Sequence, residues 1–87
     1  MKIREGQRVR MISHDNDEVA YGETGTVRGV ISLEPPIGVE WDTYNGRRHN
    51  LHHCSEGPCR IGHGWYVYDY DLEIIPTENI LNIEELI

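Results

Sequence analysis

The chain has 87 residues, of which 38% are hydrophobic and 26% charged, a composition typical of one globular domain. Its formal net charge of −7 disfavours a general binder of nucleic-acid phosphates, which usually shows a basic surface. No apolar run approaches the roughly twenty residues of a membrane span, and MKIREGQRVRMI lacks the apolar core of a signal peptide. We therefore expect a cytoplasmic monomer that contacts no membrane.

Hydrophobic and polar residues alternate in five stretches, as expected for short strands with one buried face. In the second stretch, Val27, Ile31 and Leu33 are expected to share the buried face. Trp41 in the third and Trp65 in the fourth also fall on inward positions. The five predicted strands are residues 7–12, 26–33, 37–42, 64–68 and 71–75.

Two long connections separate these strands. Residues 13–23 form a polar loop, and residues 43–63 form the longest connection, which carries both cysteines and most of the histidines. Connections of this length usually have a function or are held in place by another group. A short helical turn is expected within VYDYDLEII, just before the last strand. The pattern predicts a mainly β fold, all-β apart from short helical pieces.

The end of the chain changes from a strand pattern to a helical one. Ile80, Ile83 and Ile87 recur at the spacing of one helix face. We divide the chain into a domain at residues 1–76 and an acidic amphipathic tail at residues 77–87, predicted as a short C-terminal helix. Closure of one end of the fold, docking to a partner and disorder are the three alternatives for this tail.

The first half of the chain carries a recurring framework of small barrels. Residues 5–10 (EGQRVR), 22–27 (GETGTV) and 39–42 (VEWD) follow the pattern G-x-x-V, then G-x-x-G-x-V, then V-x-W/F-D. This framework resembles KOW-type, CAP-Gly-type and Mind-bomb-type barrels, and it covers about residues 5–42. The resemblance implies an SH3-like five-stranded small barrel, and it implies no particular activity.

The second half is similar to one narrower group. Cys59, residues 62–67 (GHGWYV) and residues 72–75 (LEII) resemble small uncharacterised proteins of bacteria and their phages. These proteins carry a loop rich in histidine and cysteine, then a G-H-G-W-x-V motif, then a closing L-E. This resemblance also supports a fold and not a reaction.

The loop of cysteines and histidines is a candidate zinc site. Zinc takes four ligands in a tetrahedron from cysteine thiolates and histidine nitrogens. The candidate set is His52, Cys54, Cys59 and His63, with His49 as a substitute for His52. A Cys54–Cys59 disulfide is a second reading, which a cytosolic location disfavours. Packing of Cys59 and His63 beneath the loop, without metal, is a third.

Exposed tyrosines point to a binding surface. Tyrosine and tryptophan are favoured at interfaces, and small barrels bind peptides on aromatic-lined surfaces. We predict a non-enzymatic binding or adaptor module whose partner is an unknown protein or peptide. Its predicted contact residues are Tyr44, Arg47, Arg48, Tyr66 and Tyr68.

A locally basic segment supports an alternative partner. Residues 43–66 hold Arg47, Arg48 and Arg60 against a single acid, so a KOW-like module that contacts a nucleic-acid strand is the alternative. A small domain stabilised by zinc is a second alternative. No cysteine, histidine and carboxylate are spaced as a catalytic set requires, so we expect no enzymatic activity.

Overall fold

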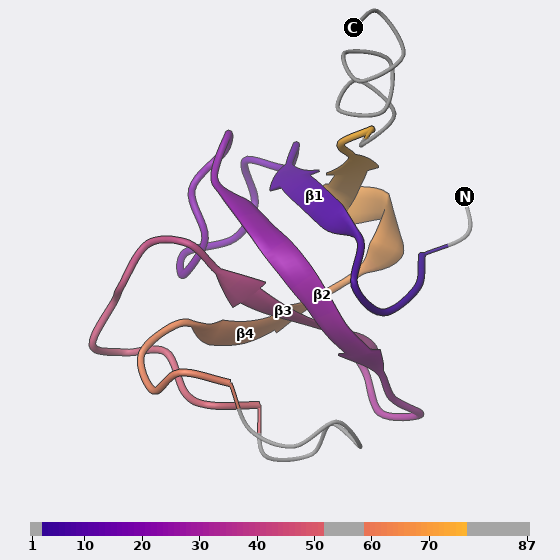
Figure 1. Ribbon diagram of the computed structural model, residues 1–87. Coiled ribbons are helices and arrows are strands. Elements are labelled where there is room, and N and C mark those ends of the chain that lie inside the picture. Colours follow the sequence, from indigo (N-terminus) through magenta and orange to yellow (C-terminus); the bar gives the residue numbers. More distant parts are fainter. Residues whose placement is uncertain (1–2, 52–58, 77–87) are drawn as a thin grey trace, which may run out of the picture.

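The computed structural model describes residues 3–51 and 59–76, which form one five-stranded antiparallel sheet. The strands pair side by side in the order β4-β3-β2-β1-β5, and Figure 1 labels the first four of them. A single turn of 3-10 helix, η1 (Asp69–Asp71), precedes the last strand. The strands are β1 (Arg8–Met11), β2 (Thr24–Val30), β3 (Ile37–Trp41), β4 (Gly64–Val67) and β5 (Leu72–Ile74). The predicted mainly β fold and the helical turn before the last strand are confirmed.

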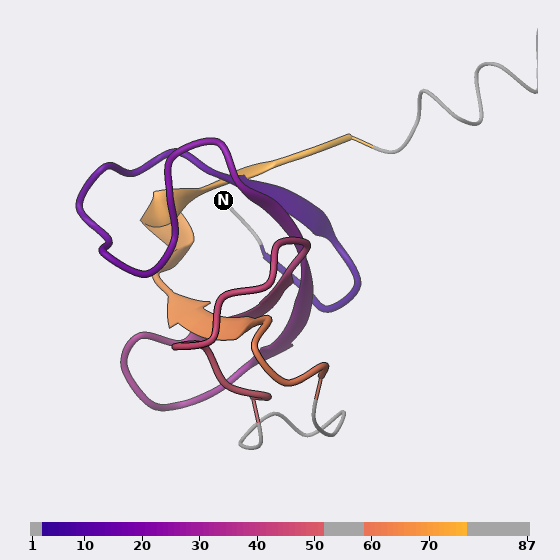
Figure 2. The same cartoon turned by 90° about the vertical axis from the view of Figure 1, so that its left-hand side faces the viewer.

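The sheet is strongly curved (Figure 2). Its ladder does not close on itself within the described residues, because β4 and β5 are its two edges. Alternation places one face of each strand inward, and Trp41 is fully buried while Trp65 packs against the core from a half-buried position. The buried core residues are Val9, Met11, Val19, Val27, Ile37, Val39, Trp41, Val67 and Leu72.

The end of β2 differs from the prediction. The pairing of β2 with β3 shifts between Val27 and Gly29, and the strand ends at Val30. Burial still alternates through this shift, because Gly25, Val27 and Gly29 are buried and Val30 is exposed. Leu33 lies beyond the end of β2, in the connection to β3, where it is 59% exposed and does not join Val27 in the core, so this part of the prediction is wrong.

The turn η1 is held against the start of the first loop. The backbone N–H of Ile12 donates to the carbonyl oxygen of Asp71 at 2.8 Å. The Asp71 carboxylate accepts a hydrogen bond from the Tyr68 backbone N–H at 3.1 Å, which closes the turn on itself. These bonds bring η1 close to a loop that is more than fifty residues away in the sequence.

The described part of the chain contains no helix long and apolar enough to cross a membrane. The predicted tail at residues 77–87 lies outside the described residues, as do His52 and Cys54.

Candidate functional site

The loop between β1 and β2, residues 12–23, has a defined internal structure. The Asn16 side-chain oxygen accepts hydrogen bonds from the backbone N–H groups of Glu18 and Val19, at 2.8 and 3.1 Å. Val19 is fully buried, and it anchors the loop to the hydrophobic core. At the loop's end, the Gly22 N–H donates to the carbonyl oxygen of Met11 at 2.8 Å. Asparagine at this spacing commonly organises a turn by binding backbone N–H groups further along the chain.

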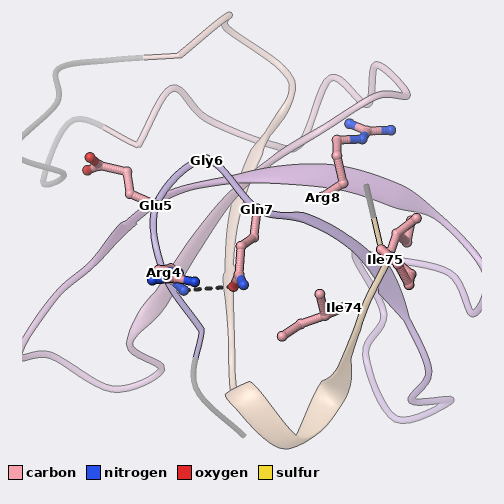
Figure 3. Close-up of a pocket in the computed structure, with 8 residues that line it drawn as sticks. Arg4, Glu5, Gly6, Gln7, Arg8, Ile74 and Ile75 are labelled. Carbon is pink, nitrogen blue, oxygen red and sulfur yellow. Dashed lines mark hydrogen bonds between the residues drawn. The ribbon is translucent and has the colours of Figure 1, made fainter. Parts of the chain in front are cut away.

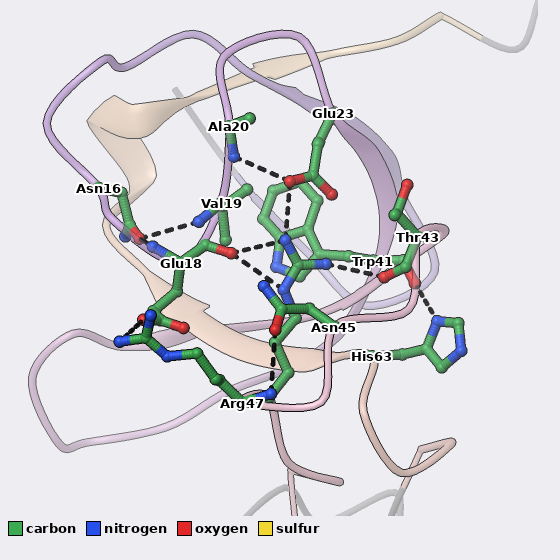
Figure 4. A network of polar contacts seen from close by, with 11 residues as sticks. Asn16, Glu18, Val19, Ala20, Glu23, Trp41, Thr43, Asn45, Arg47 and His63 are labelled. Atoms are coloured by element: carbon green, nitrogen blue, oxygen red, sulfur yellow. Dashed lines mark hydrogen bonds and ion pairs between the residues drawn. The ribbon is translucent and has the colours of Figure 1, made fainter.

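A buried arginine holds this loop to the connection after β3, and Figure 4 labels its partners Glu18, Glu23 and Thr43. The side chain of Arg48 is only 2% exposed. Its Nε and one Nη donate to the carbonyl oxygen of Glu18 at 3.0 and 2.6 Å, and the other Nη donates to that of Thr43 at 2.8 Å. An ion pair at 2.7 Å joins the guanidinium to the Glu23 carboxylate, which also accepts the Ala20 N–H. We call these contacts the Arg48 clasp.

Arg48 was among the predicted contact residues, and in the structure its side chain is buried and its donors bind groups of the same chain. Arg47, its neighbour, is 77% exposed and pairs with the Glu18 carboxylate at 2.8 Å. The sequence alone shows two adjacent arginines of equal charge. Their different surroundings arise from the fold of the loops on either side.

A cavity of about 220 Å³ lies between the first loop and η1. The rings of Tyr68 and Tyr70 stack at its edge with centroids 5.0 Å apart and planes 6° from parallel. Tyr70 is 71% exposed, so the stacked pair presents an aromatic face to solvent. We call this cavity the tyrosine groove, and its lining residues are Ser13, Asp15, Asn16, Tyr68, Tyr70 and Asp71.

The tyrosine groove is acidic. Asp15 and Asp71 line it, and within the described residues neither forms an ion pair. The pKa of the Tyr70 hydroxyl is raised above its ordinary value by desolvation, by Tyr68 and by the nearby carboxylates of Asp71, Glu34 and Asp69. The negative potential that these carboxylates create opposes a further negative charge on the phenol.

The three tyrosines predicted to contact a partner have different ring neighbours. The Tyr44 ring meets His63 edge-on at 5.9 Å, and the Tyr66 ring lies 5.4 Å from that of His49. Tyr68 alone of the three lines the tyrosine groove. Tyr70, which the predicted contact set omits, completes the pair. The sequence did contain a signal for Tyr70, because it lies two residues after Tyr68 within the predicted helical turn.

Six arginines of the described residues pair with carboxylates. Besides Arg47 and Arg48, these pairs are Arg8 with Asp42, Arg10 with Glu73, and Arg28 and Arg60 with Glu40. The positive charge of these six arginines is thus largely neutralised by carboxylates of the same chain. The acids of the tyrosine groove are not neutralised in this way.

The Arg8–Asp42 pair predicts a dependence of stability on pH. Hydrogen bonds from Arg8, the largest cause, and from Thr24 hold the pKa of Asp42 at about 2, below its ordinary 3.8. A pKa that is lower in the folded state stabilises it above pH 3.8, and the effect disappears as the pH falls to about 2. Because the Asp42 side chain is 45% exposed, we discount the full shift for solvent screening, to about 1 kcal/mol.

The comparison is with Asp42→Asn, which keeps the shape and removes the titration. In urea unfolding near neutral pH, the free energy of unfolding of wild type should exceed that of the variant by this amount. The difference should disappear as the pH falls towards 2. A difference that does not change with pH would contradict this assignment.

Two of the four predicted zinc ligands lie within the described residues. The Cys59 thiol is half-buried and donates to the Arg60 carbonyl oxygen at 3.4 Å. His63 Nδ1 lies 2.8 Å from the Trp41 carbonyl oxygen, which fixes Nδ1 as the donor and leaves Nε2 as the nitrogen with a lone pair. Within residues 3–51 and 59–76, no three histidine, cysteine or acidic side chains gather as metal ligands. The complete zinc site stays a prediction.

A second and larger cavity, of about 400 Å³, lies between the N-terminal turn and the end of β5. Figure 3 shows Gln7 and Ile74 directed into it, while Glu5 and Arg8 point away. The Gln7 side chain is already used, because its oxygen accepts the Arg4 backbone N–H at 2.8 Å. The cavity has charges of both signs and no aromatic ring among its described lining residues, so we place the candidate site at the tyrosine groove.

These features define a small antiparallel β protein with an acidic, tyrosine-lined groove beside a loop that a buried arginine holds in place. Comparison of the chain with protein-family models, with curated proteins and with solved structures finds no match.

Proposed function

We propose that this protein is a non-enzymatic binding module, built as an SH3-like barrel, that binds an extended segment of another protein in the tyrosine groove. The observation that carries the proposal is the stacked Tyr68–Tyr70 pair, exposed to solvent at the edge of a cavity. Exposed tyrosines contribute much of the free energy of protein interfaces, because they bury large area at a small cost in side-chain entropy.

The strand arrangement supports the SH3-like part of the proposal. The order β4-β3-β2-β1-β5, the long loop between β1 and β2, and the helical turn before β5 fit the features on which the resemblance rests. The tyrosine groove lies between that loop and that turn. Small barrels of this kind often bind peptides on aromatic-lined surfaces.

The distribution of charge favours a protein over a nucleic acid. A nucleic-acid site needs cations that neutralise phosphates, and Arg47 and Arg60, which were predicted to provide them, pair with Glu18 and Glu40. The groove itself carries negative charge, which repels phosphates. We therefore keep the KOW-like nucleic-acid module as the alternative, with no observation that favours it.

Selection of peptides on the protein, followed by variants of single tyrosines, tests the proposal. Peptides selected from a random library on the immobilised wild-type chain should lose about tenfold in affinity for Tyr70→Ala. They should bind Tyr44→Ala as they bind wild type, because Tyr44 is equally exposed but lies outside the tyrosine groove. Both changes are at exposed rings, so thermal unfolding should confirm that both variants fold.

Two outcomes would contradict the proposal. A library that yields no binder to the wild-type chain would show that it does not recognise extended segments. Binders that depend on Tyr44 and not on Tyr70 would place the interface at a different surface.

A further inference from the structure

We propose that the tyrosine groove recognises an arginine side chain within the segment that it binds. This inference rests on the proposed function and adds the chemistry of the partner. It follows from three properties of the groove, which are its unpaired negative charge, its aromatic face and its preorganised shape.

The first property is charge. Asp15 and Asp71 face the groove, and Glu34 and Asp69 are close enough to act on the Tyr70 hydroxyl. Within the described residues, none of these four carboxylates forms an ion pair. A cation in the groove would relieve their mutual repulsion, while an anion would increase it.

The second property is the aromatic face. Tyr68 covers one face of the Tyr70 ring, and the 71% exposure of Tyr70 leaves its other face open. A planar guanidinium can stack on such a face and still point its N–H groups at carboxylates around the rim. A lysine ammonium has no plane with which to stack, so the groove favours arginine.

The third property is that the acceptors are held in place before a ligand arrives. One carboxylate oxygen of Asp71 accepts the Tyr68 N–H, which orients the other oxygen. The backbone at Asp15 is held in place, because its N–H donates to the Ser13 hydroxyl at 3.1 Å. The Arg48 clasp fixes the remainder of the loop through the Glu18 carbonyl oxygen. Preorganised acceptors bind more tightly because less conformational entropy is lost on binding.

Four matched peptides test the inference by NMR titration of the full chain. Each is a blocked Gly-Pro-X-Pro-Gly peptide in which X is arginine, lysine, citrulline or glutamate. The arginine peptide should shift the backbone amides of residues 13–16 and 68–71 in a saturable way. Citrulline has the same shape without the charge, so it should bind at least about fivefold more weakly. Glutamate should give no saturable shift.

Variants within one loop provide the matched control. Asp15→Asn should weaken binding of the arginine peptide about threefold at low ionic strength, the size typical of an exposed charge pair. Asp17→Asn removes the same charge from the same loop, but Asp17 does not line the groove, so affinity should stay near that of wild type. Both side chains are exposed, and neither change should disturb folding.

The outcomes separate this inference from the proposed function. Equal affinity for arginine and citrulline, or equal effects of Asp15→Asn and Asp17→Asn, would overturn the inference. Equal binding of lysine and arginine would overturn the choice of arginine. If library-selected peptides depend on Tyr70 but contain no arginine, the proposed function stands and the inference fails. If no peptide binds at all, both fail.

Discussion

Replacement of Arg48 by alanine should lower the free energy of unfolding by about 3 to 5 kcal/mol. We expect no larger effect from the removal of any other single charged side chain that the structure describes. The guanidinium is buried and binds two backbone carbonyl oxygens, from Glu18 and Thr43, in addition to the Glu23 carboxylate. Its removal leaves these partly buried acceptors without their donors. A buried acceptor without a partner loses its hydration and gains nothing in return.

Arg47→Ala is the matched control. Arg47 is adjacent in sequence and also forms an ion pair, but its side chain is 77% exposed. Exposed pairs contribute about 1 kcal/mol or less, so this variant should remain close to wild type. Urea unfolding of both variants, followed by tryptophan fluorescence, measures the difference directly.

A third variant keeps this prediction testable if Arg48→Ala does not fold. Arg48→Lys retains the charge but cannot reach the Glu18, Thr43 and Glu23 acceptors with one planar fork. Its free energy of unfolding should lie between those of wild type and Arg48→Ala. Equal stability of Arg47→Ala and Arg48→Lys would show that the Arg48 clasp does not stabilise the fold as its geometry indicates.

The second large effect is expected at Gly25 in β2. A Cβ atom at this position would lie 2.7 Å from Cγ1 of Val39, 2.8 Å from the Glu40 carbonyl oxygen and 3.0 Å from Cα of Trp41. Two of these atoms belong to the β3 backbone, which cannot move without opening its pairing with β2. Gly25→Ala should therefore lower the free energy of unfolding by about 2 to 3 kcal/mol, within the range for an overpacked core.

Gly46→Ala serves as the control for this prediction. At Gly46 the nearest atom to an added Cβ is the Tyr44 hydroxyl oxygen, at 3.4 Å and at the end of an exposed side chain. This variant should unfold within about 0.5 kcal/mol of wild type. A similar loss at both positions would mean that the close contact of β2 with β3 is not the cause.

The strands were largely predictable because their signal is local. Alternation in β1, β3 and β4 identified buried residues such as Val9, Val39 and Val67. The prediction failed at the end of β2, because the strand stops at Val30 and Leu33 lies in the connection to β3, exposed to solvent. The point at which a strand ends depends on its pairing with the neighbouring strand, so the sequence of β2 alone does not show it.

The candidate site was only partly predictable. Tyr68 was in the predicted contact set, but Arg48 was placed on the surface and Asp15 and Tyr70 were left out of the set. The tyrosine groove combines residues near position 15 with residues near position 70, and no local pattern links them. The zinc site stays a prediction, because His52 and Cys54 lie outside the described residues.

By itself, the sequence determined the number, order and approximate bounds of the strands, because the alternation of apolar side chains is a property of each segment alone. Only the tertiary structure decided which of two neighbouring arginines is buried and which carboxylates face the Tyr68–Tyr70 pair. The physical reason is that burial and electrostatic surroundings depend on contacts between segments distant in the chain. The charge of a side chain follows from the residue type, but its burial and its neighbours follow from the tertiary structure.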